Sequence, residues 1–325
     1  MARLTAGIVG VSGYGGGEVL RLLASHPRLE VTYVAGEASA GTRLGERFPG
    51  LPARLAGLTI EKWDPSALPR LDVLFASLPT GESKTSLAQV PPEVRVVDIG
   101  GDHRYVEGWT YGLADVWPDR IRSATRIANP GCYPAAALVA IAPLLHAKRV
   151  DSGAPIIVDA KSGVSGAGRG GGSTFGYAEV NEDVSAYGLL KHAHVPEIGA
   201  TIKSLGGDPS RLVFTPHLIP MTRGILATIY LQGEATGEVC RGAAERFYAG
   251  RPFVRVVDRA PHTKWASGSN LAFVHYAADP ARRLIVAVAV IDNLGKGAAG
   301  QAVQNANLML GLDESTGLEL APLWP

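Results

Sequence analysis

The chain has 325 residues, with 31 basic and 30 acidic side chains and a formal net charge of +1. This balance gives no support to a polyanion-binding protein, and a hydrophobic content of 46% argues against a disordered chain. Its 2 cysteines are too few for a disulfide scaffold, and no apolar run approaches the ~18 residues of a membrane span. We expect a cytoplasmic protein of about two domains that binds neither nucleic acid nor membrane.

The first half of the chain alternates strand-like and helix-like segments. We expect strands over Thr5–Val11, Leu29–Ala35, Val73–Ser77 and Val94–Ile99, and helices over Glu18–Ser25 and Ala135–His146. This βαβ rhythm predicts an α/β domain over residues 1–150, built on a Rossmann-like, doubly wound parallel sheet.

The second half has strand candidates that are not regularly interleaved with helices. They are Pro155–Ala160, Arg211–Pro216, Gly224–Gln232, Phe253–Val257, Leu271–Tyr276 and Leu284–Ile291, with helices expected over Val195–Leu205 and Gly237–Tyr248. The pattern predicts an α+β catalytic and dimerisation domain with a mixed sheet over residues 151–297. A helix over Ala298–Leu310 ends at Gly311, and we expect residues 298–325 to join the first domain.

A glycine-rich turn follows the first expected strand. Gly10, Gly13 and Gly16 have the spacing G-x-x-G-x-x-G, a variant of the standard dinucleotide fingerprint. Glycines let the backbone approach a pyrophosphate at the amide-lined start of a helix. The alternative is a turn without a ligand, but its place in a first βαβ unit favours a dinucleotide.

The end of the second expected strand bears on the choice between NAD and NADP. Glu37 could bind the ribose of NAD. Ser39, the Gly41 amide and Arg43 could instead bind a 2′-phosphate, which requires donors and positive charge. The three donors favour NADP(H), and the sequence leaves open whether Glu37 or Ser39 faces the ribose.

Cys132 stands in a tight turn, Asn129–Pro134, just before an apolar helical run. The start of a helix favours a thiolate, which is the form that acts as a nucleophile. A buried structural cysteine is the alternative, and from position alone the two interpretations are equal. Cys240 lies inside a helical pattern, and we expect it in the core.

Two histidines precede a helix that is expected to start near Pro196 and Glu197. On an extended segment His192 and His194 would point the same way, and either could take the proton of a thiol. A metal site would need further ligands at suitable spacing, so the sequence predicts none. The other interpretation of each histidine is a hydrogen-bonded surface residue.

Two arginines follow expected strands, where open sheets place ligand residues. Arg104 follows the strand that ends near Ile99, and Arg223 follows Pro220. A guanidinium matches a carboxylate or phosphate through two contacts. A surface salt bridge is the alternative for each.

In order and completeness, these motifs resemble the N-acetyl-γ-glutamyl-phosphate reductases, a family of the aspartate-semialdehyde-dehydrogenase-like group. The segments that carry the resemblance are residues 7–23, 39–46, 98–104, 129–134, 159–169, 192–198, 218–228 and 291–305. The resemblance implies NADPH-dependent reduction of N-acetyl-γ-glutamyl phosphate to the 5-semialdehyde, in arginine biosynthesis, by a homodimer or homotetramer.

The resemblance also implies roles for matching residues. Cys132 would form a thioester, His192 would be the general acid or base, and Glu197 would orient the histidine or hold substrate. Arg104, His194 and Arg223 would bind substrate. The residues implied at the cofactor are Gly10, Ser12, Gly13, Tyr14, Gly15, Ser39, Gly41, Arg43, Pro79, Ser162, Gly163 and Asn293.

The chain departs from the family pattern at several positions. Ala193 stands between the histidines where the family has Arg, Ala135 replaces a Thr, and Ala114–Asp115 replaces a Pro-Glu pair. These departures leave a second substrate open, a 2-aminoadipate phosphate carried on an acidic carrier protein in lysine biosynthesis. A more distant alternative is a protein that senses NADP without catalysis, with an ordinary thiol at Cys132.

Overall fold

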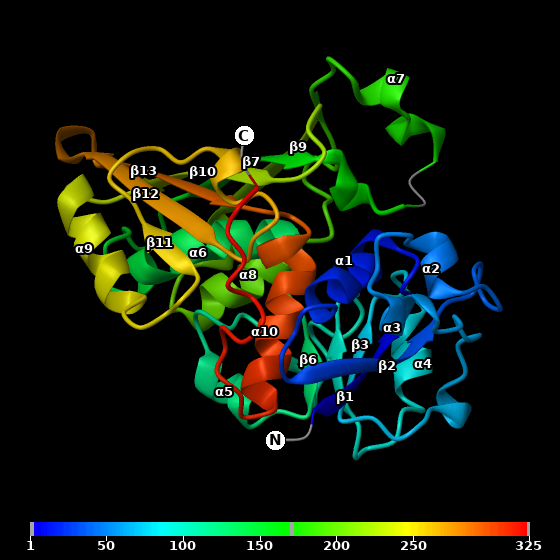
Figure 1. Ribbon diagram of the computed structural model, residues 1–325. Coiled ribbons are helices and arrows are strands. Elements are labelled where there is room, and N and C mark those ends of the chain that lie inside the picture. The colour runs from blue at the N-terminus through cyan, green and yellow to red at the C-terminus, as the bar shows by residue number, and fades with distance from the viewer. Residues whose placement is uncertain (1–2, 170–171, 324–325) are drawn as a thin grey trace. The chain divides into compact units, whose positions relative to one another are not determined.

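The structure of the protein is a computed structural model that describes residues 3–169 and 172–323. The chain folds into two compact units (Figure 1). Of the described residues, the first unit contains those up to Pro130 and Ala298–Leu320, and the second contains those from Gly131 to Gly297 and from Ala321 to Leu323. Within the described ranges, no helix has both the length and the apolar character needed to cross a membrane.

The first unit contains a six-stranded sheet in which every strand pair is parallel. The strand order is β2-β1-β3-β4-β6-β5. The strands are β1 Leu4–Val9, β2 Leu29–Ala35, β3 Val73–Ala76, β4 Arg95–Asp98, β5 Thr110–Tyr111 and β6 Arg126–Ala128. The order reverses beside β1, and the carboxyl ends of strands at such a switch point form the usual ligand crevice of doubly wound sheets.

The helices of this unit are α1 Tyr14–Leu23, α2 Leu44–Arg47, α3 Ala53–Ala56, α4 Ser83–Leu87, α5 Pro118–Arg122 and α10 Gly300–Met309. Helix α1 begins four residues before the predicted Glu18, because the glycines that follow Gly13 form its first turn. Helix α10 packs against α1 and α5, and every one of its residues is buried. Gly311, with a φ of +70°, follows its end as the sequence predicts.

The second unit contains a mixed seven-stranded sheet of order β11-β12-β13-β10-β7-β9-β8. The strands are β7 Ile156–Gly163, β8 Ser185–Ala186, β9 Leu212–Ile219, β10 Ile225–Gln232, β11 Val254–Val256, β12 Ala272–Asp279 and β13 Leu284–Ile291. β7 pairs with β9 and β11 with β12 in parallel, and the other pairs are antiparallel. A parallel sheet beside a mixed sheet confirms the predicted fold class.

The longer helices of the second unit are α6 Cys132–His146, α8 Val195–Ser204 and α9 Gly237–Phe247, and α7 Tyr177–Val180 is short. Helix α6 packs on β10 and β13, and it is buried on nearly all sides. The two units therefore divide at Pro130, whereas the sequence pattern predicts a boundary near residue 150. An all-apolar helix has no single buried face that could indicate from sequence which sheet it covers.

Candidate active site

The glycine turn of the first unit joins β1 to α1 at the carboxyl edge of the sheet. Gly10 has a φ of +76°, and a Cβ at this position would collide with the carbonyl oxygen of Ser77. A Cβ on Gly16 would collide with the carbonyl oxygen of Gly10. Because only glycine fits at both positions, the backbone can approach a ligand closely, as a pyrophosphate at a helix start requires.

The other cofactor residues predicted in this unit surround the same turn. The Ser12 hydroxyl contacts the Ser39 hydroxyl, so the turn after β2 lies against the turn after β1. Ser39 is buried, whereas Glu37 and Arg43 are exposed. The edge therefore offers both the acceptor that an NAD ribose needs and the donors that a 2′-phosphate needs.

The third strand contributes to the same edge. A Cβ on Gly15 would lie 2.7 Å from the Ser77 hydroxyl oxygen, immediately after β3, and Pro79 is exposed two residues further on. The predicted cofactor residues of this unit thus lie at the ends of β1, β2 and β3. Their arrangement fits a dinucleotide.

Arg104 lies in the loop that follows β4. Its Nε donates a hydrogen bond of 3.1 Å to the carbonyl oxygen of Asn129. Asn129 ends the strand segment that leads into the cysteine turn, and its amide donates to the carbonyl of Asp98 at 2.7 Å. The arginine is therefore fixed to the stretch of chain that precedes Cys132.

In the second unit, Cys132 is the first residue of the 15-residue helix α6 and is partly exposed. Gly131 is the N-cap, and its amide donates a 2.8 Å hydrogen bond to the Glu197 carboxylate. Glu197 is buried in the first turn of α8. The carboxylate fixes the turn of the nucleophile, and the amino end of α6 favours a thiolate there.

The two histidines lie in a turn that leads into α8, and not on the extended segment expected from their spacing. They are nevertheless neighbours, with ring centroids 4.8 Å apart. The His194 ring lies against Gly131, where a Cβ would collide with Nε2. The amide of His194 donates to Nδ1 of His192 at 3.1 Å, and burial lowers the pKa of His192. His192 is therefore largely neutral at pH 7, with its proton on Nε2.

A pocket of about 590 Å³ opens beside Cys132. Four other residues predicted for the site line it, namely Ser162, Gly163, His192 and His194. The remaining lining residues were not predicted from the sequence, and they include Tyr133, Thr174, Phe175, Glu179, Asp183 and Tyr187. Most of these lie between Thr174 and Tyr187, in the segment around α7 that extends from the sheet of this unit in Figure 1 and returns to it at β8.

Two tyrosines form a hydrogen-bonded chain in this pocket. The Tyr187 hydroxyl donates to the Tyr133 hydroxyl at 3.0 Å, and Tyr133 donates to the carbonyl of His217 at 3.1 Å. Burial raises the pKa of both phenols, and the negative charge of a Cys132 thiolate raises it further. Both tyrosines therefore stay protonated beside the thiol.

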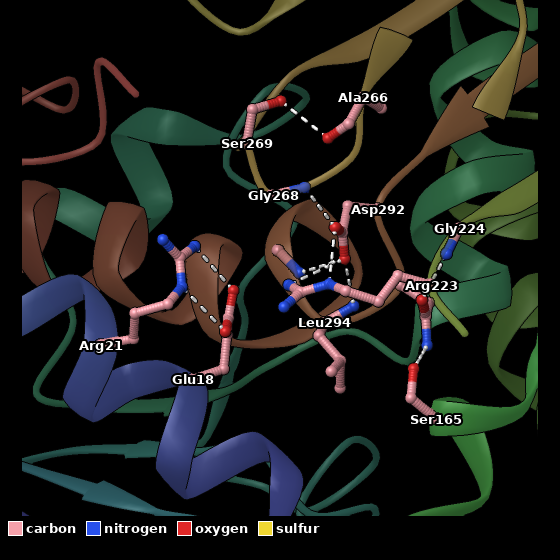
Figure 2. Close-up of polar contacts among 12 residues, drawn as sticks. Glu18, Arg21, Ser165, Arg223, Gly224, Ala266, Gly268, Ser269, Asp292 and Leu294 are labelled. Carbon is pink, nitrogen blue, oxygen red and sulfur yellow. Dashed lines mark hydrogen bonds and ion pairs between the residues drawn. The ribbon is translucent and has the colours of Figure 1, made fainter. Parts of the chain in front are cut away.

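Arg223 is bound to a fully buried carboxylate. Its Nε and Nη2 donate to Asp292 at 2.9 and 3.2 Å, and the amides of Gly268, Leu294 and Gly295 donate to the same carboxylate (Figure 2). Among the described residues that line the 590 Å³ pocket, Arg223 does not occur. The predicted substrate role of Arg223 stays a prediction, and the geometry gives it a definite structural partner.

Asn293 connects two turns at the ends of the central strands. Its Oδ1 accepts from the Gly224 amide at 2.7 Å, and its Nδ2 donates to the Ser165 hydroxyl at 2.9 Å. The carbonyl of Gly224 accepts from the Gly163 amide at 2.9 Å. Asn293 therefore supports the Gly163 turn at the wall of the pocket.

Both units match known protein families. Residues 5–124 match the family "Semialdehyde dehydrogenase, NAD binding domain", and residues 132–293 match "Semialdehyde dehydrogenase, dimerisation domain". A protein of Bradyrhizobium sp. (strain ORS 278), named N-acetyl-gamma-glutamyl-phosphate reductase, is 68% identical over 323 residues, covering 99% of each chain. Proteins of the same name from Methylobacterium sp. (strain 4-46) and Moorella thermoacetica are 66% and 40% identical, covering 99% of this chain and 99% and 100% of their own.

The chain belongs to the N-acetyl-γ-glutamyl-phosphate reductase family. Membership confirms the predicted resemblance and the prediction of an oxidoreductase with a nicotinamide-dinucleotide-binding domain.

Solved structures share the fold at low identity. An aspartate semialdehyde dehydrogenase II from Vibrio cholerae has a TM-score of 0.74 at 19% identity, covering 96% of this chain and 99% of that one. An aspartate semialdehyde dehydrogenase with NADP from Candida albicans has a TM-score of 0.75 at 16% identity, covering 95% and 99%. The likeness shows that this reductase family and the semialdehyde dehydrogenases share one architecture.

Some of the site residues that were not predicted stand next to predicted ones in the sequence. Tyr133 directly follows the nucleophile, and Tyr187 stands five residues before His192. Asp292 lies beside the predicted Asn293. Glu179 and Asp183 have no such neighbour, and only the folded segment brings them to the pocket.

Proposed function

We propose that this protein reduces N-acetyl-γ-glutamyl phosphate to N-acetylglutamate 5-semialdehyde and phosphate, through a thioester on Cys132. The observation that carries the proposal is the thiol at the start of α6, in a pocket with two histidines, in a chain 66–68% identical to proteins named for this reaction. We assign NADPH as the reductant because Ser39 contacts Ser12 of the phosphate turn, with Gly41 and the exposed Arg43 beside it.

In the first step the Cys132 thiolate attacks the acyl carbon, a C–S bond forms, and the C–O bond to phosphate breaks. The thiol proton passes to a histidine and then to the departing phosphate. When bound, NADPH would supply the hydride needed to reduce the thioester. The C–S bond then breaks, which releases the aldehyde and regenerates the thiolate. Donors near the start of α6 would stabilise the oxyanion that forms at the acyl oxygen.

The histidine geometry supports a division of roles different from the expected one. The His194 ring lies against Gly131, the residue before Cys132, and on this contact we assign His194 as the base for the thiol. His192 accepts the His194 amide on Nδ1 and carries its proton on Nε2, so it is suited to donate to the acyl oxygen. In this scheme Glu197 fixes the Gly131 amide and so acts by positioning the thiol turn.

Thiol reactivity separates the two histidine roles. We expect His194→Asn to slow alkylation of Cys132 by iodoacetamide at pH 7 by about tenfold or more. His192→Asn should lower kcat/KM for the acyl phosphate but leave the alkylation rate within about twofold. The reverse order of alkylation rates would return the base role to His192.

The reaction run backwards tests the function itself. Enzyme, N-acetylglutamate 5-semialdehyde, phosphate and NADP are mixed, and NADPH formation is followed by absorbance. We expect formation of NADPH that depends on phosphate and is lost in Cys132→Ala. Absence of a phosphate-dependent signal in the wild type, or full activity in Cys132→Ala, would overturn the proposal.

We also propose that the protein is a cytoplasmic homodimer that pairs through the open face of the seven-stranded sheet. Helices α6 and α9 pack on one face. On the other face Tyr230, Ile157 and Val213 are exposed and lie in register across β10, β7 and β9. Such an apolar row suits an isologous interface. The double variant Tyr230→Asp, Ile157→Asp should sediment as a monomer, and an unchanged sedimentation coefficient would contradict this interface.

A further inference from the structure

Strand β4 ends on a buried carboxylate that neither the cofactor turn nor the thiol pocket explains. Asp98 is fully buried and accepts from the Gly100 amide at 2.9 Å. Its Oδ2 accepts from Nδ1 of His103 at 2.7 Å and from the Ser83 hydroxyl at 3.0 Å. Burial of a carboxylate without partners costs free energy, and the three hydrogen bonds to Asp98 offset that cost.

His103 is held on a second side by an aromatic ring. It is nearly fully buried, and its ring stacks on Trp109 with centroids 3.8 Å apart and an interplanar angle of 21°. The next residue along the chain is Arg104. The contacts of His103 with Asp98 and Trp109 therefore restrict the backbone position of Arg104.

These contacts close a ring through the main chain. The carbonyl of Asp98 accepts from the Asn129 amide at 2.7 Å, and the carbonyl of Asn129 accepts from Nε of Arg104 at 3.1 Å. His103, which precedes Arg104, returns to the Asp98 carboxylate. The ring fixes both the backbone of Arg104 and the plane of its guanidinium relative to Asn129, three residues before the nucleophile.

A second carboxylate holds the neighbouring loop in place. Asp102 accepts from the Gly81 amide at 2.8 Å and from the Ser83 hydroxyl at 2.9 Å. The Ser83 hydroxyl thus lies between Asp98 and Asp102 and connects the loop after β3 to the loop after β4. The residues just before Arg104 are therefore bonded to the loop after β3 as well as to the end of β4.

We infer that Asp98 and His103 are positioning residues that hold the Arg104 guanidinium in the geometry that binds the anionic acyl-phosphate substrate. The inference rests on the proposed function, in which Arg104 is a substrate ligand. An arginine loses rotational freedom about several side-chain bonds when it binds an anion. An arginine already fixed at Nε and at its backbone has less of this freedom to lose. Pre-orientation of this kind strengthens binding without adding a contact to the substrate.

Two variants at His103 separate the hydrogen bond from the packing. His103→Phe keeps a ring to stack on Trp109 but removes the donor to Asp98, which retains Ser83 and Gly100 as partners. His103→Asn loses the ring but can place an amide donor where Nδ1 lies. If His103 served only to pack against Trp109, His103→Asn, which loses the stacking, would impair the enzyme more than His103→Phe. The inference predicts the opposite for substrate binding, with the larger rise in KM in His103→Phe.

The experiment measures kcat and KM for N-acetyl-γ-glutamyl phosphate in the full-length enzyme. We expect His103→Phe to raise KM by about tenfold with kcat within about twofold, and His103→Asn to restore KM to within about threefold of wild type. In an Arg104→Ala background His103→Phe should change kcat/KM by less than about twofold, because the residue through which it acts is gone.

A matched control comes from the other buried histidine of this unit. His26 bonds to Asn307 and to none of the residues of the ring, and His26→Leu should lower the melting temperature without raising KM. Equal KM effects of Phe and Asn at position 103, or additivity with Arg104→Ala, would overturn the inference. A wild type that turns over but an unchanged KM in His103→Phe refutes only this inference, whereas a wild type with no phosphate-dependent turnover refutes the proposed function and this inference with it.

Discussion

The two units present their functional groups in opposite ways. At the start of α1 the backbone forms the site, and Gly10 and Gly16 are required because any Cβ would strike a carbonyl oxygen. At the start of α6 the side chains form it, since the pocket of Cys132 is lined by residues spread from 132 to 218. A backbone site can be encoded in one short segment, whereas a side-chain site depends on segments that meet only in the folded unit.

The largest expected effect is at the nucleophile. Cys132→Ser should lower kcat by about ten-thousandfold or more, because an alcohol is a far poorer nucleophile than a thiolate at neutral pH. NADPH binding, followed by fluorescence titration, should stay within about twofold of wild type, since the glycine turn belongs to the other unit. Cys240→Ala, in the buried face of α9, is the control and should keep wild-type kcat. Loss of NADPH binding in Cys132→Ser would contradict the independence of the cofactor site from the nucleophile.

Removal of the buried Asp292 carboxylate should strongly destabilise the second unit. Asp292→Ala leaves Arg223 and three amides without their common acceptor, and we expect it to lower the free energy of unfolding by about 3–5 kcal/mol in urea denaturation. Arg21→Ala removes a half-exposed partner of Glu18, drawn with it in Figure 2, and should cost about 1 kcal/mol or less. Equal costs for the two variants would show that the buried carboxylate is not a central support.

The backbone site should respond to a single methyl group. Gly10→Ala adds a Cβ against the Ser77 carbonyl at a φ of +76°, and we expect KM for NADPH to rise by about tenfold or more. Gly57→Ala is the matched control, because its φ is −78° and a Cβ there would have no neighbour closer than 3.9 Å. An unchanged KM in Gly10→Ala would mean that the turn does not hold the cofactor.

The smallest expected effect is a pH dependence of stability in the first unit. Burial lowers the pKa of His26, whose Nδ1 accepts the amides of Arg28 and Leu29 and so resists protonation. The unfolded chain takes up a proton near pH 6.5, whereas the folded chain takes it up only at a lower pH, so stability is full above pH 6.5 and falls as the pH decreases below it. His26→Asn should reduce the loss of unfolding free energy between pH 7.5 and 5.5 by about 1 kcal/mol. An identical pH dependence in the variant would assign the loss to other groups.

The contrast between the units also explains what could be predicted from sequence. The parallel sheet, the glycine turn and Cys132 follow from local patterns, because strand periodicity and glycine sterics act within a few residues. The division at Pro130 does not, since α6 is apolar on all sides and only tertiary packing decides which sheet it covers. Glu179 and Asp183 reach the pocket through the path of the α7 segment, which no local pattern encodes.

For the polar residues, the sequence indicates which side chains lie near one another better than it indicates their hydrogen-bond partners. The sequence predicts that His192 and His194 lie together, but the contact of the His194 ring with Gly131 depends on the turn at the start of α8. Arg223 was singled out as a ligand residue, and its partner Asp292 lies 69 residues away on another strand end. Contacts of this range are set by strand order, which the sequence pattern does not specify.

Acyl transfer in the absence of reductant tests the central claim most directly. Wild-type enzyme is mixed with N-acetyl-γ-glutamyl phosphate without NADPH, and phosphate release and intact protein mass are measured together. We predict a burst of about one phosphate per chain and an N-acetylglutamyl adduct that peptide mapping locates on Cys132. Phosphate release that requires NADPH, or an adduct on any residue other than Cys132, would contradict the thioester mechanism.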